Sequence, residues 1–340
     1  MKYRNLIRRT FLWLTVIGAL GSATLSQGQA EPLRVALALP GSISDRGFNA
    51  SAHAGLMLIK ERMGDDVEVT FSEDVQRPDF VSTLRDYAAR GYDVIFTHGF
   101  QWSDAIQQVA RENPDISFMN VYGVGSADNL LNLDVSNEDL FYVLGYAATR
   151  MSESGTVGAV GGWEIPPIRI QVDAFMRGVA AGDPDVDFRS IFTGTFYDAV
   201  RGREATKALI DQGADVIAHM ADATGLGVIQ SASEADVLSI GYFVDQREVA
   251  PNSVATSAII NVPEMYWAGI QSVMDGSFEG GQVVYGLGTP VLAVGPWGDM
   301  VSAEVQNETA ALVQDIVDGN VVVERANVGV LMEAEINMLE

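Results

Sequence analysis

Clusters that combine an aromatic ring, small residues and a carboxylate or amide recur along the chain, each at the end of a short apolar run. In the first cluster, Asp45 and Asn49 offer an acceptor and an amide, and Phe48 offers a flat apolar face. The later clusters contribute Phe100, Trp102, Trp163, Phe196, Asp198, Asp222 and Asp245. Rings with a few polar groups can hold a small flat molecule by stacking and by oriented hydrogen bonds.

Each of these residues also has a purely structural interpretation. Asp45 can cap a helix that starts near Phe48, with the Phe48 ring in the core. A single aromatic residue after a strand is more often a core residue than part of a binding site. Five clusters at the same place in the pattern nevertheless favour a shared site.

Catalytic chemistry finds less support in the sequence. His53, His98 and His219 are far apart and lack the spacing of metal ligands, and the chain has no cysteine and no Gly-x-Ser-x-Gly motif. Aspartates could act as a general acid and base only if two of them faced each other, which nothing in the sequence indicates. We therefore expect a binding protein and not an enzyme, with no cofactor and no metal.

The elements around these clusters alternate between strands and helices. Residues 33–39, 67–71, 93–97 and 116–120 have the composition of buried strands, and stretches of helical period lie between them. The same alternation restarts after Ser136. We expect an α/β fold of two doubly wound parallel-sheet domains joined by hinge strands, one formed by residues 31–136 plus about 253–285 and the other by 137–252 plus about 286–340. Strand carboxyl ends share one edge of a sheet, so the clusters would line the cleft between the domains.

The first 30 residues resemble an export signal. Basic residues precede an apolar run at 11–20, and Gly28-Gln29-Ala30 forms a small-residue cleavage site. Arg8-Arg9 fits a twin-arginine signal, and an ordinary secretory signal with adjacent arginines is the alternative. The absence of cysteine leaves no site for a lipid anchor. We expect an exported, soluble periplasmic protein.

The charge balance excludes two classes of partner. The chain carries a formal net charge of −24 at pH 7, which repels the phosphate backbone of nucleic acids and anionic lipid surfaces. We therefore expect no nucleic-acid partner.

Several motifs in order resemble the basic membrane protein/purine nucleoside receptor family of ABC-transporter substrate-binding proteins. They are Ser44-Asp45-Arg46-Gly47-Phe48-Asn49, Gly91-Tyr92-Asp93-Val94-Ile95, Leu144-Gly145-Tyr146-Ala147-Ala148, Val157-Gly158-Ala159-Val160-Gly161-Gly162, Gly213-Ala214-Asp215-Val216-Ile217 and Asp245-Gln246. The resemblance implies a type I periplasmic-binding fold, an ABC permease as partner, and a purine held between rings. It further implies that Asp45 and Asn49 read the base, that Phe196 stacks on it and that Asp245 makes a polar contact.

Two departures from this family concern the ligand. Ile260 stands where nucleoside-binding members have a ribose-contacting lysine, and Asp222-Ala223 replaces the usual Gly-Gly pair. Loss of a charged ribose contact favours a free base such as adenine over a nucleoside. We expect a monomer that binds such a purine. A purine nucleoside receptor, a ligand-binding sensor, an exported nucleoside hydrolase and a sugar receptor of the same fold are the alternatives.

Overall fold

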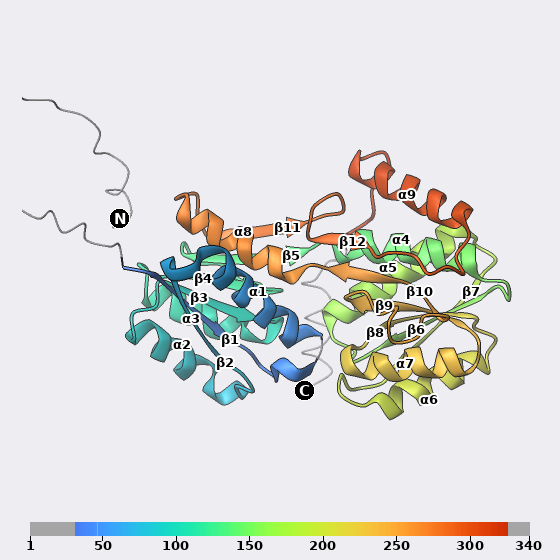
Figure 1. Ribbon diagram of the computed structural model, residues 1–340, viewed down its shortest axis with the longest axis horizontal. Coiled ribbons are helices and arrows are strands. Elements are labelled where there is room, and N and C mark those ends of the chain that lie inside the picture. The colour runs from blue at the N-terminus through green and yellow to red at the C-terminus, as the bar shows by residue number, and fades with distance from the viewer. Residues whose placement is uncertain (1–30, 46, 326–340) are drawn as a thin grey trace, which may run out of the picture.

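Two six-stranded sheets form the centres of two α/β domains, which lie side by side along the long axis of the molecule (Figure 1). This computed structural model describes residues 31–45 and 47–325. The expected export signal at 1–30, Arg46, and residues 326–340 of the expected second domain lie outside the described residues. The fold predicted from the sequence, two parallel-sheet α/β domains, is confirmed.

The first sheet has the strand order β11-β5-β4-β3-β1-β2, and all its neighbouring strands are parallel. Its strands are β1 (Leu33–Ala38), β2 (Val67–Ser72), β3 (Val94–His98), β4 (Ser117–Val121), β5 (Leu130–Val135) and β11 (Gly281–Tyr285). The helices of this domain are α1 (Phe48–Met63), α2 (Phe80–Ala89), α3 (Ser103–Glu112) and α8 (Val262–Met274). Every residue of β3 is buried, because helices cover both faces of the sheet.

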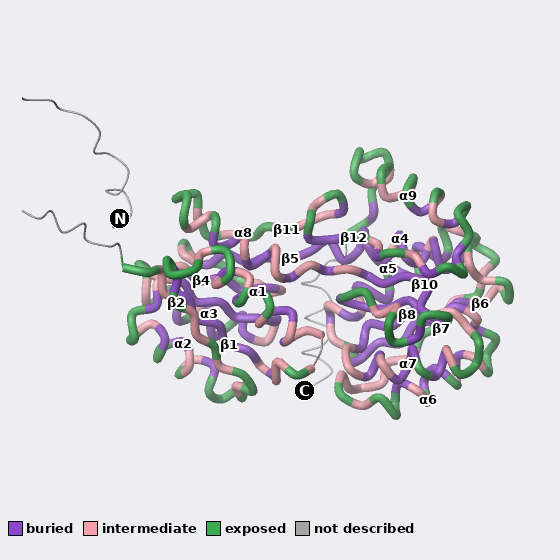
Figure 2. The backbone as a smooth tube through the Cα atoms, in the orientation of Figure 1, coloured by how far each residue is buried: buried purple, intermediate pink, exposed green. Residues whose placement is uncertain are grey.

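The second sheet has the order β12-β10-β9-β8-β6-β7, and its edge strand β12 runs antiparallel to β10. Its strands are β6 (Thr156–Gly161), β7 (Asp187–Phe192), β8 (Val216–Met220), β9 (Leu238–Phe243), β10 (Val254–Ile260) and β12 (Leu292–Val294). The helices are α4 (Asn137–Met151), α5 (Pro166–Gly182), α6 (Ala199–Ile210), α7 (Asp222–Glu234) and α9 (Ala303–Val317). Buried backbone follows the central strands of both sheets, such as β3 and β8, and exposed backbone follows the outer loops (Figure 2).

Helices α4 and α5 pack at unusually short range, because each presents a glycine to the other. A Cβ on Gly145 would collide with the carbonyl of Phe175, and a Cβ on Gly178 would collide with the carbonyl of Tyr142. This contact places the first turns of both helices beside the boundary between the domains. The same apolar cluster that contains Val35 and Leu37 of the first domain includes Phe175 of the second, so the two cores are continuous.

The chain passes between the domains after β5, after β10 and after β11. The sequence-based division placed residues from about 253 in the first domain, and the structure corrects this. Strand β10 pairs with β9 and β12 in the second sheet, and the chain returns to the first domain only at α8, which packs on α1. The physical reason is that Val254–Ile260 is an apolar run buried by its own sheet neighbours and not an exposed connection.

Candidate ligand-binding site

A cavity of about 230 Å³ lies between the two domains. Its lining residues come from the first domain (Pro40, Phe48, Phe100, Gln101, Tyr122) and from the second (Asn137, Ile165, Pro167, Ile168, Gln171, Phe196, Tyr197, Asp222, Tyr242, Phe243). Most of them follow the carboxyl end of a strand or begin a helix, which is where open α/β sheets bind their ligands. The volume is below the range of about 300–1,000 Å³ that is usual for small-molecule sites.

Three of the lining residues have a left-handed backbone conformation although none is glycine. The φ angles are 63° at Tyr122, 46° at Asp222 and 70° at Phe243, each at or just after the end of a strand. Such a conformation costs about 1–3 kcal/mol per residue and persists only where the surrounding structure enforces it. Here it bends the strand ends so that two rings and a carboxylate line the cavity.

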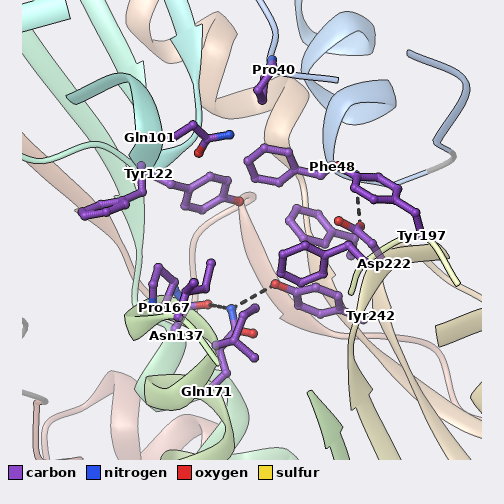
Figure 3. Close-up of a pocket in the computed structure, with 15 residues that line it drawn as sticks. Pro40, Phe48, Gln101, Tyr122, Asn137, Pro167, Gln171, Tyr197, Asp222 and Tyr242 are labelled. Atoms are coloured by element: carbon purple, nitrogen blue, oxygen red, sulfur yellow. Dashed lines mark hydrogen bonds between the residues drawn. The ribbon is translucent and has the colours of Figure 1, made fainter. Parts of the chain in front are cut away.

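Rings from both domains meet around this space. Phe48 and Tyr122 of the first domain lie 5.9 Å apart between centroids at 27°. Phe243 of the second domain approaches both edge-on, at 6.0 Å from Phe48 and 6.4 Å from Tyr122, each at 87°. Phe100, Phe196, Tyr197 and Tyr242 add further rings to the lining (Figure 3). A flat ligand can therefore stack on rings of both domains at once.

Behind the rings that line the cavity, His98 packs against the ring of Phe48. The two ring centroids lie 4.1 Å apart, and Nδ1 of His98 lies 3.2 Å from the hydroxyl of Tyr266. Complete burial lowers the pKa of His98 to about 3, so the imidazole is neutral near pH 7. His98 thus acts as a packed side chain, and His219 is likewise buried.

Among the described residues that line the cavity, Asp222 is the only one with an acidic or basic side chain. It begins α7 in the second domain, and its Oδ1 accepts the backbone N–H of Phe48 at 3.3 Å in the first domain. Gly47 permits this approach, because a Cβ there would lie 2.5 Å from Oδ1 of Asp222. Burial, with a smaller contribution from the charge of Asp45, raises the pKa of Asp222 to about 7.

A second polar group of the site is the amide of Gln171 on α5. Its Nε2 donates to Oδ1 of Asn137 at 2.9 Å and to the hydroxyl of Tyr242 at 3.0 Å (Figure 3). Its Oε1 is buried without a hydrogen-bond partner among the described residues, and the hydroxyl of Tyr122 is in the same state.

Four of the residues selected from the sequence line the cavity: Phe48, Phe100, Phe196 and Asp222. Asp45 and Asn49 lie outside it. The carboxylate of Asp45 accepts the backbone N–H groups of Gly47, Asn49 and Ala50 and the side-chain amide of Asn49, at 2.7–3.0 Å. The first N–H groups of α1 thus engage the carboxylate of Asp45. Oδ1 of Asn49 is buried without a hydrogen-bond partner among the described residues, and a role of Asp45 and Asn49 in reading a ligand stays a prediction.

The other four residues also lie outside the cavity, for separate reasons. Trp102 is fully buried and stacks on Phe80 at 3.7 Å, whereas the side chain of Trp163 is 52% exposed. Asp198 caps α6 by accepting from the backbone of Val200 and Arg201. Asp245 forms an ion pair with Arg247 at 2.8 Å, which holds the pKa of Asp245 below its usual value.

The lining residues that were not selected from the sequence are Pro40, Gln101, Tyr122, Asn137, Ile165, Pro167, Ile168, Gln171, Tyr197, Tyr242 and Phe243. Gln101, Tyr197, Tyr242 and Phe243 stand near selected residues at strand ends, whereas Asn137 and Gln171 lie on helices. Tyr122 follows a strand as the recognised clusters do, so its position was a usable signal. Asn137 and Gln171 carried none, because a polar residue on a helix is ordinarily exposed to solvent.

Two further observations concern metal sites and membrane-spanning helices. In residues 31–45 and 47–325, no three histidine, aspartate or glutamate side chains are grouped so that they could hold a metal ion. In the same ranges, no helix has the length and apolar character needed to cross a bilayer.

The raised pKa of Asp222 predicts a pH dependence of stability. The pKa of an aspartate in an unfolded chain is about 3.9, whereas the pKa of Asp222 in the folded protein is about 7. Between these values the folded state holds the extra proton, so the free energy of unfolding contributed by Asp222 falls as pH rises from about 4 to about 7 and is constant above. Ligand-free wild type should lose stability relative to Asp222→Asn over this window in urea unfolding.

The comparison with the variant is needed because other groups titrate in the same range. Burial raises the pKa of Asp134 to about 6, which acts in the same direction, and lowers those of His98 and His219 to about 3 and 4, which acts in the opposite direction. These contributions cancel in the difference between the two proteins. A difference that does not change with pH would contradict the assignment.

Two α/β domains with a ring-lined cavity between them, connected by three chain crossings, define a solute-binding protein of the periplasmic-binding type. The chain belongs to the Bmp family of PnrA-like ABC transporter substrate-binding proteins, whose sequence model matches residues 33–327. The family resemblance seen in the sequence motifs is thereby confirmed.

Individual relatives share about a quarter of their residues with this chain. It is 28% identical over 271 residues to a purine-binding protein of Brucella abortus, covering 79% of this chain and 77% of that one. It is 27% identical over 290 residues to a putative ABC transporter glucose-binding protein of Haloferax volcanii, covering 85% and 73%. A solved ABC transporter solute-binding protein from Conexibacter woesei superposes with a TM-score of 0.71 at 26% identity, covering 87% and 99%.

Proposed function

We propose that this protein is the periplasmic receptor of an ABC importer for a purine and that it prefers the free base to the nucleoside. The observation that carries the proposal is the arrangement of Phe48, Tyr122 and Phe243 with Asp222 around one small cavity. Stacking on aromatic side chains is worth about 1–3 kcal/mol per base. The carboxylate of Asp222 can accept an N–H of the base, the role that the family resemblance had assigned to Asp45.

The composition of the lining supports a flat heterocycle over a sugar. Seven aromatic rings line the cavity, and Asp222 is the charged side chain among the described lining residues. A sugar presents hydroxyl groups around its whole rim, and each would need a polar partner when buried. The similarity to a purine-binding protein points the same way, and the putative glucose-binding relative makes glucose a necessary comparison.

Preference for the free base is supported by Ile260. This residue, at the position of the family's ribose-contacting lysine, is only 2% exposed in β10 and is absent from the cavity lining. No basic side chain among the described lining residues takes the place of that lysine. A ribose in the cavity would therefore lack a charge-assisted contact with a basic side chain.

Ligand capture would follow from closure of the two domains around the base. The hydrogen bond from the N–H of Phe48 to Asp222 and the contact of Phe243 with Phe48 both cross the domain boundary. A base that stacks on rings of both domains binds this arrangement better than a separated one and so shifts the population toward it. One chain supplies both walls, so the receptor acts as a monomer and presents the closed form to its permease.

The test is a thermal-shift screen of the mature protein, residues 31–340, against adenine, guanine, adenosine, uracil and glucose. A ligand at 100 times its Kd stabilises the folded state by about 2.7 kcal/mol, which raises the melting temperature by several degrees. We expect the largest shift with a purine base and a smaller one with adenosine. A shift with glucose alone, or with none of these compounds, would overturn the proposal.

A further inference from the structure

We propose that the side-chain amide of Gln101 pairs with the edge of the base where an exocyclic amine stands beside a ring nitrogen, so that the receptor selects a purine that carries an amine. This inference rests on the proposed function and deepens it, because it names the edge of the ligand that the first domain reads. The family motifs quoted above do not include Gln101.

The first support is the place of Gln101 in the cavity. The lining residues of the first domain are Gln101, one proline and three aromatic residues (Pro40, Phe48, Phe100 and Tyr122). In the close-up, the side chain of Gln101 points toward the rings of Phe48 and Tyr122 (Figure 3). Gln101 is half-buried, and its amide is neither sealed from solvent nor hydrogen-bonded within the described part of the chain. Both polar atoms of this amide are therefore open to a ligand.

The second support is the turn that holds Gln101 in place. Before it, Gly99 has a φ of 114°, and its N–H donates to the carbonyl of Val121 at 2.8 Å. After it, Trp102 is fully buried and stacks on Phe80 at 3.7 Å. The amide of Gln101 lies against Gly99, since a Cβ on Gly99 would be 2.5 Å from Oε1 and 3.1 Å from Nε2. A group that is held in place before binding loses less conformational entropy when the ligand arrives.

The chemistry of the amide fits an amine-bearing base. Glutamine presents a donor, Nε2, beside an acceptor, Oε1. Adenine presents the complement, an exocyclic N–H beside a ring nitrogen, and glutamine can form two hydrogen bonds with that edge. Asp222 lines the cavity from the other domain and can accept a different N–H of the same base. One flat ligand therefore meets a polar group from each domain, which favours the closed arrangement.

The experiment compares adenine with unsubstituted purine by titration calorimetry, using the wild type, Gln101→Met and Gln101→Glu. Unsubstituted purine keeps the rings and the ring N–H but lacks the amine. We expect the wild type to bind adenine about 5- to 150-fold more tightly than purine, as the contribution of a bidentate amide contact predicts. Gln101→Met removes both polar atoms, and Gln101→Glu replaces the donor by a second acceptor. Both variants should bind adenine and purine with similar, weaker affinity.

Gln108→Met is the matched control. Gln108 is a glutamine on the neighbouring helix α3, and its amide donates to Glu112 outside the cavity lining. This variant should keep the wild-type preference for adenine. Thermal unfolding of each variant without ligand checks that the fold is intact.

The possible outcomes separate this inference from the proposed function. Equal binding of adenine and purine to the wild type would overturn the inference and leave the purine receptor intact. A preference for adenine that survives in Gln101→Met, or that is lost in Asp222→Asn instead, would assign the amine to another group. Failure of every purine to bind the wild type would overturn the proposed function itself.

Discussion

Replacement of Phe48 by alanine is expected to lower purine affinity by about 5- to 150-fold, which corresponds to the 1–3 kcal/mol of base stacking on one ring. Phe48 lines the cavity, lies 5.9 Å from Tyr122 and touches Phe243 of the other domain. Its loss removes both a stacking surface and a contact between the closed domains. Titration calorimetry with adenine measures the effect directly.

Trp163→Ala serves as the control for this measurement. Trp163 is also aromatic and also follows a strand, but it is half exposed and lies outside the cavity lining. Its replacement should leave affinity unchanged within about a factor of two, because an exposed side chain away from the site contributes little. A larger loss in Trp163→Ala than in Phe48→Ala would show that the ligand binds elsewhere. Thermal unfolding of both variants checks that the fold is intact.

The second large effect is expected for Asp222→Asn. The asparagine keeps the shape of the side chain and an oxygen that can accept from the N–H of Phe48, but it removes the carboxylate. Hydrogen bonds to charged groups contribute about 1.5–3 kcal/mol, so adenine affinity at pH 8 should fall by about 10- to 150-fold. This pH lies above the pKa of about 7, so the wild-type group is ionised.

Asp245→Asn is the matched control for Asp222→Asn. Asp245 also follows β9 in the second domain, but its carboxylate is engaged with Arg247 outside the cavity lining. Adenine affinity should be unchanged in this variant. If Asp245→Asn weakens binding and Asp222→Asn does not, the polar contact implied by the family resemblance is correct and the cavity assignment is wrong.

Asp45 and Asp222 show why the site could be predicted only in part from the sequence. Both follow a strand, both stand at the start of a helix, and both belong to clusters with the same local composition. Asp45 turns back onto the first backbone N–H groups of its own helix. Asp222 has a φ of 46° and reaches the first N–H of a helix in the other domain. No local pattern distinguishes these two outcomes.

The aromatic residues likewise divide between the cavity and the core in a way that no local pattern predicts. Trp102 and Phe100 are two residues apart in one turn, yet Trp102 stacks on Phe80 in the core and Phe100 lines the cavity. Tyr122 and Phe243 reach the cavity through left-handed backbone conformations that their residue types disfavour. Their positions depend on the surrounding sheet and not on their own propensity.

The sequence by itself determined the alternation of strands and helices, the two domains and the family, because apolar periodicity and motif order are local properties of the chain. It also determined that rings and carboxylates gather at the carboxyl ends of the strands, since parallel strands share that edge. Only the tertiary structure decided which of them face the cavity. It added Gln171 and Asn137 from helices and placed β10 in the second sheet, because those contacts join residues that are distant in the chain.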